Sequence, residues 1–140
     1  MNQLAPISPA QRDQLIAAAC EARARAYAPY SRFQVGAAVL ADDGRLYTGV
    51  NVENASYGLT VCAERNAIGM MVAGGATRLV AVAVCTVNGA SPCGACRQVL
   101  SEFVDHADDV PVWIIDGQGT VCETTLFTLL PDHFGPQHLC

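Results

Sequence analysis

Residues 79–85, with the sequence LVAVAVC, form an uninterrupted apolar run that is rich in β-branched valine. Such a run is typical of a β-strand that is covered by other elements on both faces. Helical patterns flank this strand, over residues 61–72 before it and over residues 94–103 after it. A buried strand between two helices predicts a sheet with helices packed on its faces, which is the α/β class.

The remainder of the chain extends this arrangement. Ser8, Pro9 and Gln11 have the pattern of an N-cap, a first helical residue and a capping box, so a helix is expected from there to about Tyr27. The other predicted elements are strands at 34–40, 46–50 and 110–115, a short strand near 120–123 and a helical turn at 125–130. We therefore expect one catalytic domain over residues 1–140, with a mixed β-sheet of about five strands sandwiched by helices.

Composition excludes several classes of function. All eight basic residues are arginine, and a chain without lysine has neither a P-loop lysine nor a lysine amine for Schiff-base chemistry. The formal net charge of −5 argues against a nucleic-acid partner, because such partners select basic surfaces. The apolar runs are too short to span a membrane, and the first residues lack the pattern of a signal peptide. We expect a cytoplasmic protein that binds no membrane.

Seven cysteines among 140 residues is a high number. An odd count without a secretory signal makes a disulfide framework a poor explanation, whereas metal binding or catalysis accounts for it. Some of these residues are expected to be inert. Cys20, Cys85 and Cys122 are predicted to be small buried apolar side chains, and Cys140 an exposed thiol.

Three cysteines have the spacing of metal ligands. Cys62 stands at the predicted start of one helix, and Cys93 and Cys96 stand at the start of another. The partial positive charge of a helix N-terminus favours the thiolate form that zinc requires. Cys93 and Cys96 are three residues apart and therefore lie on one face of a first helical turn. Three protein ligands leave the fourth tetrahedral position to water, which is the pattern of a catalytic zinc.

Glu64 and Arg65 follow the first of these cysteines. On a regular helix Cys62 and Glu64 would point in different directions, so both reach one site only if Cys62 lies at the very start. The cysteine is then a metal ligand, and Glu64 faces a substrate beside it. Three thiolates on Zn²⁺ give a net charge of −1, and Arg65 is placed to compensate by donating to a thiolate sulfur.

Other interpretations of these residues remain open at this point. The Cys93-x-x-Cys96 pair alone could be a redox pair, as in thioredoxin-like proteins. A closed structural zinc, in an interaction module, could take its fourth ligand from Cys85, Cys122 or His133. Taken together, however, cysteine ligands, a glutamate that is not a ligand and a Pro-Cys-x-x-Cys run match the signature of zinc deaminases.

The chain resembles the cytidine deaminase family, specifically its short, homotetrameric branch with three cysteine ligands. The motifs that carry the resemblance are YAPYSRF at 27–33, VGAA at 35–38, NVENASYG at 51–58, CAER at 62–65, PCGACRQ at 92–98 and LLPDHF at 129–134. The resemblance implies one Zn²⁺ per chain and hydrolysis of cytidine and deoxycytidine to uridine and deoxyuridine, with release of ammonia, in pyrimidine salvage. Zinc-activated hydroxide attacks C4 of the base, and Glu64 moves the protons.

The same resemblance implies the substrate contacts within one subunit. Asn51 and Glu53 match residues that bind the 3′-hydroxyl of the ribose, and Phe33 matches an aromatic ring that stacks on the pyrimidine. The backbone of Ala63 and the carbonyl of Ser91 match groups that contact the edge of the base.

The resemblance also implies a homotetramer whose subunits share their active sites. Tyr57 and Phe134 match the residues that such subunits contribute to a neighbour.

Two rival substrates remain. A deaminase for another aminopyrimidine, such as blasticidin S, would have no use for the ribose-binding pair Asn51 and Glu53. A nucleic-acid-editing deaminase would need a basic channel, which a chain of net charge −5 is not expected to form.

Overall fold

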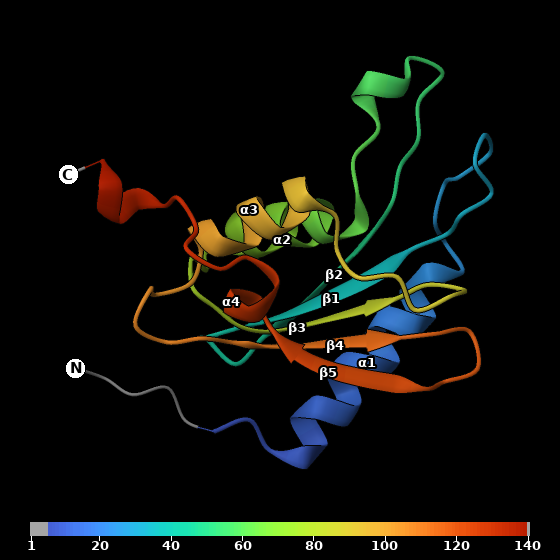
Figure 1. Ribbon diagram of the computed structural model, residues 1–140. Coiled ribbons are helices and arrows are strands. Elements are labelled where there is room, and N and C mark those ends of the chain that lie inside the picture. Colours follow the sequence, from blue (N-terminus) through green and yellow to red (C-terminus); the bar gives the residue numbers. More distant parts are fainter. Residues whose placement is uncertain (1–5, 140) are drawn as a thin grey trace.

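Strand β3 (Leu79–Cys85) lies in the centre of the sheet (Figure 1). The computed structural model describes residues 6–139, which form five strands in the order β2-β1-β3-β4-β5. The other strands are β1 (Gly36–Ala41), β2 (Leu46–Val50), β4 (Pro111–Ile115) and β5 (Val121–Thr125). Only β3 and β4 run parallel, and the other neighbouring pairs are antiparallel. The sheet is therefore mixed, as predicted.

Helices cover both faces of this sheet. The helices are α1 (Pro9–Arg23), α2 (Ala63–Ala73), α3 (Gly94–Glu102) and the short α4 (Leu126–Leu129), with 3₁₀ turns η1 (Tyr57–Leu59) and η2 (Pro136–His138). Figure 1 shows α1 on one side of the sheet and α2 and α3 on the other. Side chains of β3 alternate accordingly: Val82 and Val84 pack in the α2–α3 core, whereas Ala81 and Ala83 pack in the α1 core. The α/β fold with a helix-covered sheet is confirmed.

Helix α2 packs almost directly on the backbone of β2. A Cβ atom at Gly49 would lie 2.4 Å from the carbonyl oxygen of Ala63 and 2.4 Å from the backbone nitrogen of Ala67. Real side chains cannot approach a backbone so closely, and only glycine permits this contact. The close approach fixes the start of α2 next to the end of β2.

One helix boundary differs from the predicted one. The capping box of Ser8 and Gln11 is present, but α1 ends at Arg23 instead of continuing to Tyr27. The reason is tertiary: the backbone nitrogen of Tyr27 donates to Asn51, and its carbonyl accepts from Glu53, in a strand-like bridge. This pairing moves the segment after α1 to the side of residues 51–53.

The cysteines outside the predicted ligand set follow expectation only in part. Cys85 is buried and Cys20 is half-buried. The prediction for Cys122 was wrong: its side chain is exposed, because β5 is an edge strand with a neighbour on one side only. Cys140 lies outside the described residues. Within residues 6–139, none of the helices has the length and apolar character needed to cross a membrane.

Candidate active site

A cavity of about 260 Å³ lies where β2 ends and where α2 and α3 begin. It collects residues from segments that are far apart in the sequence. The lining residues are Ser31, Phe33, Val35, Asn51, Glu53, Thr60, Cys62, Ala63, Glu64, Val84, Thr86, Ala90, Ser91 and Cys93. Eight of the residues predicted from the sequence to belong to a site are among them.

The three predicted metal ligands meet at this cavity. Cys62 is the N-cap of α2 and Cys93 the N-cap of α3, and neither sulfur caps its own helix. The sulfur atoms of Cys62, Cys93 and Cys96 all lie within 4.8 Å of one another, and those of Cys93 and Cys96 are 3.4 Å apart. Two helix N-termini therefore direct their positive ends at one cluster of thiols.

This donor set fits zinc. Thiolate sulfur is a preferred zinc ligand, and sulfurs at these separations can share one tetrahedral ion. Among residues 6–139, no further histidine, cysteine or carboxylate joins the three-sulfur group. Cys85, Cys122 and His133 thus do not join the group, and an ion held by the three sulfurs would receive no fourth ligand from them.

The charge of the thiol cluster is unevenly distributed. Hydrogen bonding from the Cys96 thiol, supported by Arg65, lowers the pKa of Cys62 to about 5. The same bond raises the pKa of Cys96, which is also buried. The guanidinium of Arg65 donates from Nη2 to the Cys62 sulfur at 3.6 Å and to the carbonyl of Thr60 at 3.5 Å. Arg65 occupies the place expected of a group that offsets thiolate charge.

Glu64 is a buried carboxyl at the wall of the cavity. It lies in the first turn of α2, and only 4% of its surface is exposed. Burial raises the pKa of Glu64, because a low-dielectric environment disfavours the charged form. A carboxyl with a raised pKa, placed beside the thiol cluster without belonging to it, can take up and return a proton.

Asn51 and Glu53 have a structural task besides lining the cavity. The Asn51 Oδ1 accepts from the backbone nitrogen of Val35 at 2.9 Å, and its Nδ2 donates to the carbonyl of Phe33 at 2.7 Å. The Oε1 of Glu53 accepts from the backbone nitrogens of Tyr30 and Ser31 at 2.9 and 3.1 Å. Both side chains hold the segment that carries Phe33.

The opposite wall is the loop before α3. Thr86, which is buried, accepts from the backbone nitrogen of Ala90 at 2.9 Å, and Ser91 accepts from Arg97 at 2.9 Å. Arg97 also donates to the carbonyl of Pro92 at 2.7 Å. Ser31 and Thr86 also line the cavity, although neither was predicted to belong to a site. The position of Thr86, a polar residue directly after the apolar run of β3, is a signal that could have identified it.

Tyr57 and Phe134 do not line the cavity. Tyr57 is 75% exposed and lies on η1, in a segment that projects away from the sheet and the helices (Figure 1). Its ring contacts the ring of Tyr30 edge-on, with centroids 5.9 Å apart. Phe134 is 57% exposed and follows α4. The single chain therefore leaves both aromatic rings available to another molecule.

The known proteins to which this chain is similar point to one family. Residues 9–112 match the model of the cytidine and deoxycytidylate deaminase zinc-binding region. The chain is 46% identical to a cytidine deaminase of Sporosarcina psychrophila, over 91% of this chain and 93% of the relative. It is 49% identical to a cytidine deaminase of Halalkalibacterium halodurans, over 88% of this chain and 93% of the relative.

Solved structures agree with these relatives. The crystal structure of cytidine deaminase from Burkholderia pseudomallei superposes with a TM-score of 0.80 at 46% identity, covering 87% of this chain and 98% of that one. The enzyme from Mycobacterium tuberculosis gives a TM-score of 0.74 at 45% identity, covering 89% and 97%. The likeness therefore covers most of this chain and nearly all of both solved chains.

Proposed function

Because this chain belongs to the cytidine and deoxycytidylate deaminase family, we propose that it is a zinc-dependent cytidine deaminase in which Glu64 moves the protons. It converts cytidine and deoxycytidine, with water, to uridine and deoxyuridine and ammonia. The observation that carries the proposal is a cluster of three thiols and one buried carboxyl at a single cavity, which is lined by Cys62, Cys93 and Glu64. The substrate is a free pyrimidine nucleoside and not a nucleic acid, because a chain of net charge −5 lacks the basic surface that nucleic acids select.

Zinc is the cofactor of this site. Cys62, Cys93 and Cys96 would hold it, and the bound ion would supply a water of lowered pKa. The positive ends of α2 and α3 and the guanidinium of Arg65 offset the negative charge of the thiolates.

Glu64 handles every proton of the reaction. Its carboxylate takes a proton from the attacking water and delivers it to N3 of the base while the oxygen bonds to C4. It then transfers the second proton of that water to the exocyclic amine, so that the C4–N bond breaks and ammonia departs. The raised pKa of Glu64 matches a group that must both accept and return protons.

The remaining cavity residues orient the nucleoside. Phe33 stacks on the pyrimidine, and the backbone of Ala63 and the carbonyl of Ser91 contact its edge. Asn51 and Glu53 bind the 3′-hydroxyl of the sugar. All five line the cavity that contains Glu64, which supports a single binding mode with the base toward the thiols and the sugar toward residues 51–53.

The working form is a homotetramer with shared active sites, in which Tyr57 and Phe134 reach into neighbouring subunits. Their high exposure, and that of Leu59 at 66% on the same projecting segment as Tyr57, supports burial against another copy. Residues 1–140 act as a single catalytic domain in the cytoplasm, in pyrimidine salvage.

The test is a direct assay. Purified protein is expected to hold about one zinc per chain and to convert cytidine and deoxycytidine, followed by the loss of cytosine absorbance. A strong zinc chelator should stop turnover, and added zinc should restore it. Blasticidin S is assayed in parallel as the alternative substrate. Zinc-loaded protein that leaves both nucleosides unchanged would refute the proposal.

A further inference from the structure

One hydroxyl group links the residue proposed to bind the sugar with the residue proposed to stack on the base. The Oγ of Ser31 donates to Oε2 of Glu53 and accepts from the backbone nitrogen of Phe33 at 3.0 Å. Ser31 itself lines the cavity together with both partners. The hydroxyl of Ser31 therefore donates its single proton to Glu53 and accepts one hydrogen bond from the backbone of Phe33.

The carboxylate of Glu53 has nearly all of its acceptor positions filled. Two backbone N–H groups, of Tyr30 and Ser31, bond to Oε1, and the Ser31 hydroxyl bonds to Oε2. A carboxylate accepts about four hydrogen bonds, two on each oxygen. One position on Oε2 is left. The Ser31 hydroxyl decides in which direction that last lone pair points, because it occupies the other position on the same oxygen.

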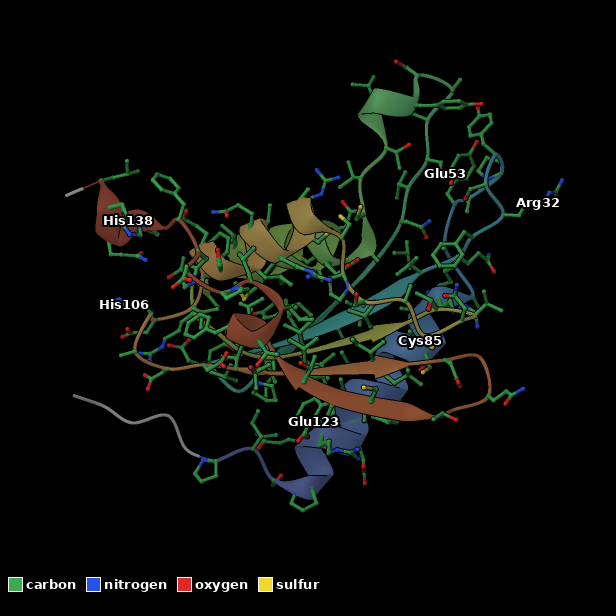
Figure 2. The ribbon with its side chains drawn as sticks, in the orientation of Figure 1. Arg32, Glu53, Cys85, His106, Glu123 and His138 are labelled. Carbon is green, nitrogen blue, oxygen red and sulfur yellow. The ribbon has the colours of Figure 1, made fainter. Side chains whose placement is uncertain are left out.

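The backbone between the two partners of this hydroxyl is sharply turned. Arg32 has a φ of 58°, in the left-handed region that residues other than glycine seldom adopt. The turn allows the side chain of Ser31 to reach the backbone of Phe33, two residues ahead. Figure 2 shows the Arg32 side chain pointing outward, away from Glu53. The conformation thus supports the Ser31 bonds and brings no charge of Arg32 into the cavity.

We propose that Ser31 is a positioning residue for sugar recognition: its hydroxyl aims the free acceptor of Glu53 at the 3′-hydroxyl of the nucleoside while it holds the backbone of Phe33. The inference rests on the proposed function, because it assigns Ser31 to the same substrate. The Ser31 bond also lowers the pKa of Glu53, which keeps the carboxylate ionised as an acceptor. Ser31 acts through Glu53 and takes no part in proton transfer.

The experiment compares two nucleosides, cytidine and 3′-deoxycytidine, in four proteins. Ser31→Ala is expected to lower kcat/KM for cytidine about tenfold, as loss of a hydrogen bond to a charged group does. On 3′-deoxycytidine, which offers no 3′-hydroxyl, the loss should shrink to about twofold. Ser31→Thr keeps an oxygen at the same place and should restore activity on cytidine to within a factor of about three. Arg32→Asn, a change on the same turn outside the cavity, should match the original protein.

Three outcomes would overturn the inference: no loss in Ser31→Ala, an equal loss on both nucleosides, or no rescue by Thr. Zinc content and melting temperature, measured on every variant, identify a variant that has merely lost its fold. If turnover of 3′-deoxycytidine is too slow to follow, competitive inhibition by uridine and by 3′-deoxyuridine gives the same comparison. An unmodified protein that is inert on cytidine would refute the proposed function instead, so the two failures are distinguishable.

Discussion

The Nη2 of Arg65 lies 3.6 Å from the sulfur of Cys62, one helical turn earlier on the same helix. A cation at this distance stabilises the thiolate without entering the coordination sphere. The two residues are three positions apart in the CAER motif, and their contact joins a proposed metal ligand to a group that offsets its charge.

Replacing Arg65 by alanine should weaken the site. We expect a loss of roughly 10–100-fold in zinc affinity or in kcat/KM, because the thiolate charge is no longer offset. Zinc competition with a coloured chelator and cytidine kinetics measure the two quantities. Arg45→Ala, in the exposed hairpin turn, is the matched control and should change neither. If the two variants have the same zinc affinity and the same kcat/KM, Arg65 does not offset the thiolate charge.

Glu64→Gln should separate metal binding from proton transfer. The amide has the size of the carboxyl but cannot accept the water proton, so the rate should fall by roughly 10²–10⁴-fold. Zinc content should stay at one ion per chain, since Glu64 is not among the sulfur ligands. Metal analysis and kcat on the same preparation provide the measurement. Glu102→Gln, exposed at the end of α3, is the control, and substantial turnover by Glu64→Gln would exclude the proton-transfer role.

Loss of a single thiol ligand should abolish both zinc and activity. Cys93→Ser removes a sulfur from the three-thiol cluster, and a two-cysteine remnant binds zinc weakly. Cys122→Ser changes an exposed cysteine on the edge strand and should retain one zinc and full turnover. Elemental analysis after dialysis compares the variants. Retention of one zinc by Cys93→Ser would show that Cys93 is not a required ligand.

Two glycines, one in β2 and one in α2, should respond oppositely to replacement by alanine. Gly49→Ala pushes a methyl group into the backbone of α2 and should destabilise the fold by about 1–3 kcal/mol. Gly69→Ala lies within α2 with open space around it and should stabilise the fold by about 0.5–1 kcal/mol. Urea unfolding measures both changes. A neutral Gly49→Ala would mean that α2 can move off β2 without cost.

Shared active sites can be tested by complementation. Tyr57→Ala/Phe134→Ala subunits and Glu64→Gln subunits should each be poorly active alone, because one lacks the contributed aromatic rings and the other lacks the proton carrier. Coexpressed, they should form mixed tetramers in which some sites are intact, with activity restored in part. Sedimentation measures the size of the assembly. A fully active monomer, or mixtures without any restored activity, would contradict sharing.

Local pattern predicted most of the fold. The bounds of β2 and β3 agree with the predicted 46–50 and 79–85, because the residues that favour these strands lie within the strands themselves. The end of α1 did not follow from local pattern. Tyr27 leaves the helical path to pair with residues 51–53, and nothing near Tyr27 in the sequence encodes that partner.

The residues of the site likewise fall into those that local sequence predicts and those that depend on distant partners. Cys62, Cys93 and Cys96 could be identified because their spacing at helix starts brings thiols together. The contact between Ser31 and Glu53 spans 22 residues and depends on two loops meeting, so it could be seen only in three dimensions. Tyr57 and Phe134 stay predictions, since their partners belong to an assembly that one chain does not contain.

The N-cap positions of Cys62 and Cys93 have a consequence for the whole molecule. An ion held by both sulfurs closes a loop that contains all of α2 and β3, and so acts as a cross-link across the centre of the fold. Ligands that bind only the folded state favour it by mass action. Free zinc concentration should therefore govern what fraction of the chains is folded as well as what fraction can react.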